Sequence, residues 1–117
     1  MSPLDLLTLG VGAGMALSGA AICFYWYVYW NRNFQGKLLT EGPYSYVRHP
    51  LYTGFMLLTI GLALAVPVYE TRLLLVLTTA VIVVYVPKEE EALLRQYKQR
   101  YRGYMEKVRH RLVPHIY

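Results

Sequence analysis

The feature that most constrains this chain is a long uncharged run near its start. Residues 6–31 contain no Asp, Glu, Lys or Arg. As a helix rising about 1.5 Å per residue, such a run is long enough to cross a hydrocarbon core of about 30 Å. A signal peptide is disfavoured, because the preceding MSPLD carries no Lys or Arg and no small-residue cleavage site follows. Instead the run ends in FYWYVYW, aromatic residues typical of a membrane–water interface.

Two further uncharged runs, 50–69 and 73–87, follow a polar connection. Pro50 is well placed to start a helix, and Arg72 and Lys88 can extend from the ends of the last run toward water. We therefore predict an all-α integral membrane protein with a single domain. Its predicted parts are transmembrane helices at about 5–30, 50–68 and 71–87, a cofactor loop at 31–49, and an amphipathic cytosolic or interfacial helix at 88–112, within one domain of residues 1–117.

Positive charge is concentrated toward the end of the chain. Residues 1–87 hold four Lys/Arg and three Asp/Glu, whereas residues 88–117 hold eight Lys/Arg and four Glu. Since Lys and Arg are enriched on the cytoplasmic side of membrane proteins, we expect the N-terminus outside and the C-terminus in the cytoplasm. The loop at 31–49 and the basic tail then share one side, where membrane lipids are the expected partners. No nucleic-acid partner is expected, because the aromatic residues of the tail repeat at the spacing of a packed helix face.

The apolar residues of the tail recur at steps of three or four, with Lys, Arg, Gln and Glu in most of the gaps. This spacing indicates one amphipathic helix. The simplest interpretation is a helix in the headgroup layer, anchored there by its tyrosines. The residues that define the pattern are Leu93, Leu94, Tyr97, Tyr101, Tyr104, Val108 and Leu112.

Small residues form a stripe along the first predicted span. Gly10, Gly14, Ser18 and Gly19 put small residues at helical spacing. Such a stripe allows the close approach of another helix, either from the same chain or from a second copy. A second copy that packs there would form a homo-oligomer through the face of Gly10, Gly14 and Ser18.

Two polar clusters are expected to meet on the cytosolic side. One is the loop and corner from Lys37 to Tyr52, and the other is the glutamate run 89–91. Residues 50–87 form a predicted hairpin, so its two ends return to the same membrane level. Alone, Arg48 could bind a lipid phosphate and His49 could cap a helix. Acidic groups facing a histidine at a Gly-Pro corner indicate instead a site for a bound cation.

GPYSYVRHPLYTG resembles the G-P-Y-x-x-x-R-H-P-x-Y-x-G signature of the isoprenylcysteine carboxyl methyltransferase family and its phospholipid methyltransferase relatives. These enzymes continue with a helical hairpin, a glutamate pair, a Leu, F-G-x-x-Y-x-x-Y, a Val and a final Pro. The resemblance covers about residues 36–116. The matching residues of the second motif are Glu89, Glu90, Leu93, Tyr97, Tyr101, Tyr104, Val108 and Pro114.

This resemblance implies S-adenosylmethionine as methyl donor and a lipophilic acceptor that enters from the bilayer, either an isoprenylcysteine-like carboxylate or a lipid amine. A carboxylate suits the α-ammonium of this cofactor, and tyrosine faces suit its sulfonium. Since methyl transfer depends mainly on positioning, no catalytic residue is assigned, and no metal is expected. The cofactor contacts that the resemblance implies are Lys37, Leu38, Leu39, Tyr44, His49, Pro50, Leu51, Tyr52, Glu89 and Glu90.

The chain departs from the family pattern at two places. Lys98 stands where the family often has Gly. Prenylcysteine methyltransferases also place an Arg shortly before the glutamates to meet the substrate carboxylate, and Tyr85 stands there in this chain. Arg48, Tyr85 and Lys88 are therefore the candidate substrate contacts.

Two other classes of protein remain as alternatives. Sterol reductases bind NADPH and share a similar R-H-P-N-Y-x-G corner, but Leu51 replaces their Asn and the many preceding helices are missing. A non-catalytic scaffold or lipid-binding module is the second alternative. The intact His49, Tyr52 and Glu89 favour an enzyme over that module.

Overall fold

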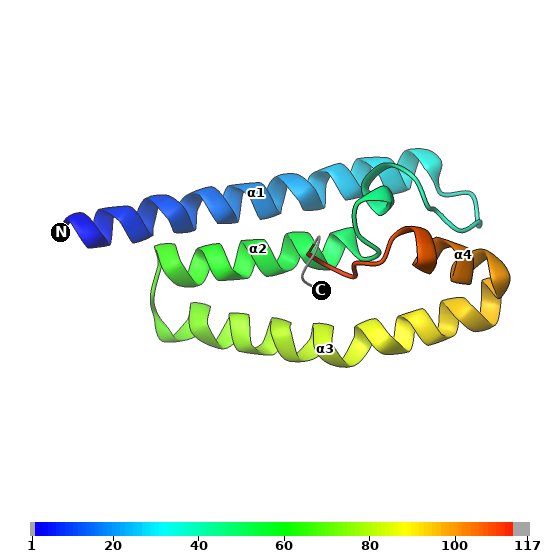
Figure 1. The fold of residues 1–117 in the computed structure, drawn as a ribbon. Coiled ribbons are helices and arrows are strands. Elements are labelled where there is room, and N and C mark those ends of the chain that lie inside the picture. The colour runs from blue at the N-terminus through cyan, green and yellow to red at the C-terminus, as the bar shows by residue number, and fades with distance from the viewer. Residues whose placement is uncertain (1, 114–117) are drawn as a thin grey trace.

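The computed structural model describes residues 2–113, and all regular structure in that range is helical. The predicted all-α class is thus confirmed, whereas Pro114 of the second motif lies outside the described residues. α2 lies between α1 and α3, and the short α4 folds back from the end of α3 toward the loop that follows α1 (Figure 1). The elements are α1 (Pro3–Asn33), the 3-10 helix η1 (Gly42–Ser45), α2 (Pro50–Ala65), α3 (Tyr69–Tyr97) and α4 (Gln99–Lys107).

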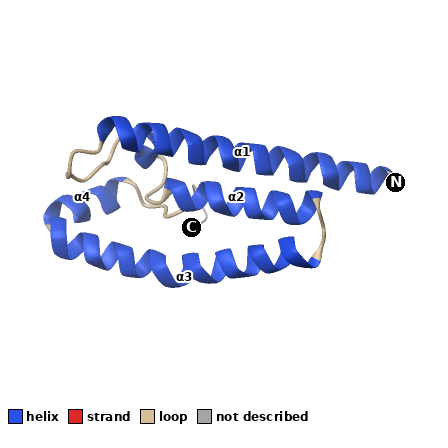
Figure 2. Cartoon of the chain, turned by 180° about the vertical axis from the view of Figure 1, so that it is seen from behind, coloured by secondary structure: helices blue, strands red, loops and turns tan. Residues whose placement is uncertain are grey.

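Two helices are long and apolar enough to cross a membrane. They are α1, with 31 residues, and α3, with 29. α2 has only 16 residues, which at about 1.5 Å per residue make a helix of about 24 Å. The third crossing therefore stays a prediction. Seen from the other side, the three helices run nearly parallel, and the polar loops gather at the end where α4 lies (Figure 2).

α1 and α2 pack through glycines that bring their backbones together. Gly12 and Gly19 of α1 are buried against Gly61 and Gly54 of α2. A Cβ added at Gly12 would lie only 2.7 Å from the carbonyl oxygen of Gly61 and 2.5 Å from the Ala65 nitrogen. Such small-residue contacts allow helices to associate without a hydrophobic driving force in lipid.

The small-residue stripe predicted for oligomerisation lies elsewhere on α1. Gly10, Gly14 and Ser18 are exposed, and a Cβ at either glycine would meet open space. Of the four predicted small residues, Gly19 makes the close contact with α2 in the same chain. An oligomer through the exposed stripe stays a prediction.

The predicted tail helix at 88–112 is wrong in its bounds. α3 continues through Pro87 and the glutamates to Tyr97, and α4 starts only at Gln99. Proline removes one backbone hydrogen bond of a helix but need not end it, and α3 bends in its second half (Figure 1). The actual break is at Lys98, whose φ of 52° and ψ of −118° cannot continue a helix.

Lys98 is the one non-glycine residue with positive φ in the range 2–113. We expect Lys98→Gly to raise the free energy of unfolding by about 0.5–1 kcal/mol, because relief of backbone strain exceeds the added entropy of glycine in the unfolded chain. Arg102→Gly, at an exposed position inside α4, should instead lose about 1 kcal/mol. Unfolding in detergent measures both changes. A Lys98→Gly variant as unstable as Arg102→Gly would contradict the strain at this hinge.

Candidate functional site

A cavity of about 400 Å³ lies where the end of α1, the loop at 34–49, the start of α2 and the last part of α3 meet. Its walls are mainly aromatic and aliphatic, with a few polar groups. A volume of this size is typical of small-ligand sites in proteins. The lining residues are Trp26, Trp30, Phe34, Lys37, Leu38, Leu39, Tyr44, Arg48, His49, Pro50, Leu51, Tyr52, Glu89, Ala92, Leu93 and Tyr97.

The structure brings most of the predicted cofactor residues to this one cavity. All of them line it except Glu90. Of the candidate substrate contacts, only Arg48 lines it. Tyr85 is 52% exposed, and the ammonium of Lys88 lies 6.0 Å from the Tyr85 ring, so these two side chains interact on the outer surface.

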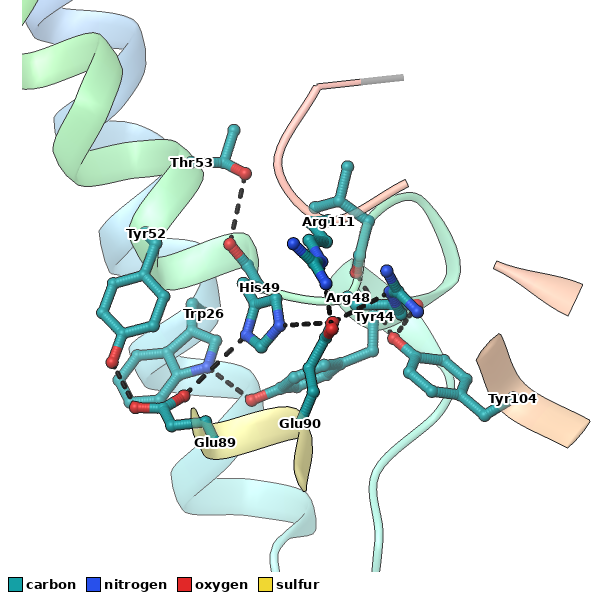
Figure 3. A network of polar contacts seen from close by, with 11 residues as sticks. Trp26, Tyr44, Arg48, His49, Tyr52, Thr53, Glu89, Glu90, Tyr104 and Arg111 are labelled. Atoms are coloured by element: carbon teal, nitrogen blue, oxygen red, sulfur yellow. Dashed lines mark hydrogen bonds and ion pairs between the residues drawn. The ribbon is translucent and has the colours of Figure 1, made fainter. Parts of the chain in front are cut away.

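The predicted meeting of the corner and the glutamates is confirmed. His49 Nε2 lies 2.9 Å from Glu90 Oε2, and the Tyr52 hydroxyl donates to Glu89 Oε1 (Figure 3). The two partners of each pair come from the start of α2 and the second half of α3. The hairpin of α2 and α3 therefore joins residues about 40 positions apart.

Glu90 is the centre of a buried ion cluster. Glu90 is only 3% exposed. In addition to His49, its carboxylate contacts Arg48 Nε at 3.1 Å and Arg111 Nε at 3.0 Å. Glu90 does not line the cavity, because its carboxylate faces Arg48 and Arg111 on the Nε2 side of the His49 ring (Figure 3). Arg48 is likewise committed to Glu90. The two neighbouring glutamates thus have different surroundings.

An aromatic wall on α1 was missed by the sequence analysis. The rings of Trp26 and Trp30 stack at 5.5 Å between centroids, and those of Trp30 and Phe34 at 4.0 Å. The sequence analysis assigned the region to an interfacial belt, and Phe24, 69% exposed, does face outward. The spacing of four from Trp26 to Trp30 to Phe34 was the signal available, because it puts the three rings on one helix face.

α4 covers the loop side of the site. Tyr101 and Tyr104 are 1% and 5% exposed and pack on Leu38, Tyr44 and Leu93, so they do not anchor the helix in the headgroup layer. The Tyr104 hydroxyl donates to the Tyr44 carbonyl oxygen at 2.6 Å. Burial raises the pKa of both phenols above its usual range.

The segment after α4 crosses the corner and is tied to it by backbone bonds. The backbone N–H groups of Arg48 and His49 donate to the carbonyl oxygens of His110 and Arg111, each at 2.8 Å. The Thr53 hydroxyl donates to the Leu112 carbonyl oxygen at 2.6 Å. No motif in this segment pointed to such a role. Its contact with the corner depends on chain reversal after α4, which residue spacing does not reveal.

The arrangement suits a cation that carries an apolar body. Glu89 supplies a carboxylate at the cavity wall, aromatic faces surround it, and leucines at 38, 39 and 51 line the remainder. Aromatic faces and a carboxylate both stabilise positive charge that has left water. Trp26 adds a further fixed contact, because its indole Nε1–H donates to the Tyr44 hydroxyl at 2.6 Å.

Comparison with known proteins gives one match. A family model described as phospholipid methyltransferase matches residues 6–100, a range that includes every residue that lines the cavity. No curated protein and no solved structure matches the chain.

Proposed function

Because the chain belongs to the phospholipid methyltransferase family, we propose that it transfers a methyl group from S-adenosylmethionine to a lipophilic acceptor in the membrane. The observation that carries this proposal is the cavity itself. The loop with its signature corner and Glu89 lie about 40 residues apart along the chain, yet they enclose a single space of about 400 Å³.

The lining residues fit S-adenosylmethionine group by group. Glu89 would hold the α-ammonium through charge-assisted hydrogen bonds, and the faces of Tyr44 and Tyr52 would stabilise the sulfonium. Leu38 and Leu51 would flank the adenine. Bound there, the cofactor supplies an electrophilic methyl group.

The chain's own contribution to the reaction is positioning and the exclusion of water. Methyl transfer requires the acceptor, which for an amine is the deprotonated form, in line with the carbon–sulfur bond that breaks as S-adenosylhomocysteine leaves. Correct orientation can supply several kcal/mol of the barrier. α4 with its buried Tyr101 and Tyr104 closes the loop side of the site against solvent. The aromatic wall at Trp26 and Trp30 keeps water from the α1 side.

We propose a lipid amine as acceptor in preference to an isoprenylcysteine carboxylate. A carboxylate acceptor needs a cation at the site, but Arg48 is paired with Glu90, and Tyr85 replaces the family's carboxylate-binding Arg. Lys37 is the remaining cation that lines the cavity. A carboxylate acceptor held by Lys37 is therefore the second candidate.

The proposed orientation puts the cofactor and the acceptor on separate routes. With the N-terminus outside and three crossings, the loop at 31–49 and α4 lie on the cytoplasmic side, as the basic residues favour. The cofactor then enters from the cytosol. The acceptor enters sideways from the bilayer, which surrounds the exposed apolar residues of α1 and α3.

Radiolabelled methyl transfer tests the proposal. The purified protein in liposomes of a total lipid extract is incubated with S-adenosylmethionine labelled in its methyl group, and the lipids are separated. We expect label in lipid that resists mild base, because N-methyl groups are stable, whereas methyl esters release methanol. Base-labile label would instead indicate the carboxylate acceptor. Absence of protein-dependent label in every lipid fraction would contradict the function.

A further inference from the structure

The imidazole of His49 stands between two carboxylates at unequal distances. Nε2 lies 2.9 Å from Glu90 Oε2, whereas Nδ1 lies 3.8 Å from Glu89 Oε2 (Figure 3). Hydrogen bonds between nitrogen and oxygen usually span about 2.7–3.2 Å, so only the contact with Glu90 is a hydrogen bond. The residue is buried, which limits competition from water at either nitrogen.

The contact with Glu90 decides which nitrogen carries the proton. An ionised carboxylate can only accept, so Nε2 must donate its N–H. In neutral imidazole the other nitrogen is then an acceptor, and here Nδ1 is the nitrogen beside Glu89. Tyr52 donates to Oε1 of Glu89, and the other oxygen, Oε2, faces Nδ1. With a neutral imidazole, two acceptor atoms thus face each other across 3.8 Å at the edge of the cavity.

Glu90 is itself fixed by the segment that follows α4. Arg111 binds Glu90 Oε1 through Nε at 3.0 Å, and its carbonyl oxygen accepts the backbone N–H of His49 at 2.8 Å. One residue of the tail therefore holds both the histidine and the carboxylate that orients it. Arg48 holds the second oxygen of Glu90 at 3.1 Å. Neither Glu90 nor Arg111 lines the cavity.

We propose that Glu90 and Arg111 are positioning residues, which fix His49 so that its Nδ1 and Glu89 Oε2 form a two-acceptor cradle for a ligand ammonium group. An ammonium has several N–H donors and can bond to both atoms at once. This inference rests on the proposed function only for the source of the ammonium, either the α-ammonium of the cofactor or the amine of the acceptor. The orientation of His49 is a property of the chain without ligand.

The protonated nitrogen can be identified directly in the unliganded protein. The chain is labelled with ¹⁵N in its histidines and examined by NMR in detergent at a pH of about 8, above the ordinary pKa of imidazole. His110→Gln and His115→Gln variants assign the signals by difference. We expect His49 to carry its proton on Nε2, with the lone pair on Nδ1. A proton on Nδ1, in the other tautomer or in an imidazolium, would overturn the cradle.

The role of Arg111 is tested with a matched pair of variants. Arg111→Gln and Arg109→Gln remove the same charge two residues apart, but Arg109 is exposed, and its Nε donates to the Glu106 carbonyl oxygen of its own segment. S-Adenosylhomocysteine carries the α-ammonium, whereas methylthioadenosine lacks the whole amino-acid portion. We expect Arg111→Gln to weaken binding of the first roughly three- to tenfold and to leave the second unchanged, as a lost hydrogen bond would.

The outcomes show whether the ammonium belongs to the cofactor or to the acceptor. They also distinguish a failure of the cradle from a failure of the proposed function. If Arg111→Gln leaves S-adenosylhomocysteine affinity unchanged but raises the KM for the lipid amine, the cradle holds the acceptor. Equal losses for both adenosyl ligands, or no change in affinity and KM, would overturn the positioning role. Arg111→Lys should restore part of the affinity. A wild-type chain that binds neither adenosyl ligand would remove the proposed function, while the NMR result would still decide the cradle.

Discussion

Replacement of Glu89 by Gln is expected to weaken S-adenosylmethionine binding about ten- to hundredfold. Hydrogen bonds to charged groups are worth about 1.5–3 kcal/mol, and the carboxylate of Glu89 is the acidic group that lines the cavity. The neutral amide keeps the size of the side chain but loses the attraction for an ammonium. The Tyr52 hydroxyl now donates to Glu89 Oε1. The N–H₂ group of glutamine cannot accept that hydrogen bond. Equilibrium binding of the labelled cofactor in detergent measures the effect.

Glu91→Gln is the matched control for this change. It removes the same charge from the same helix, but residue 91 is exposed and does not line the cavity. We expect its cofactor affinity to stay within about twofold of wild type, because exposed charges are screened by solvent and salt. Equal losses for the two variants would show that helix charge, and not a contact with Glu89, governs binding.

The Glu90→Ala variant is expected to lose about 3–5 kcal/mol of unfolding free energy. Removal of one partner from a buried ion cluster leaves the other charges without compensation. Arg48, whose side chain is 8% exposed, would face an apolar surrounding, and His49 would lose its hydrogen-bond acceptor. Denaturant unfolding in mild detergent measures the loss.

Combination with Arg48→Gln tests whether the loss arises from the ion cluster. Once Glu90 is absent, the buried Arg48 guanidinium lacks its counter-charge and destabilises the fold. The double variant should therefore be no less stable than Glu90→Ala alone. Losses that add would indicate that the two side chains act independently. Glu91→Ala should change stability by less than about 0.5 kcal/mol, as is usual for exposed positions.

The helices were predictable because the lipid environment demands long uncharged runs, and residues 6–31 and 73–87 satisfy that demand directly. The end of α3 was not predictable in the same way. Pro87 and Glu89–Glu91 resemble a helix boundary in sequence, yet the carboxylates of Glu89 and Glu90 find partners in the corner and the helix continues. The break instead occurs at Lys98, where backbone conformation and not composition decides.

The site could be predicted to the extent that a motif marks it. The resemblance to the family signature identified the corner and Glu89, and the predicted hairpin placed them side by side. Apolar periodicity shows that a residue faces something apolar, but it does not distinguish lipid from a cavity. For this reason Trp26 and Trp30 were assigned to the membrane interface, although their rings line the cavity. The role of Arg111 could not be predicted, because only the tertiary fold brings it to its partner Glu90.

Binding of S-adenosylmethionine by the purified chain tests the central claim most directly. The proposed function predicts saturable binding in the micromolar range, competed by S-adenosylhomocysteine, unaffected by NADPH, and strongly weakened in Glu89→Gln. Binding of NADPH together with no detectable binding of S-adenosylmethionine would contradict the claim and favour the reductase-like alternative.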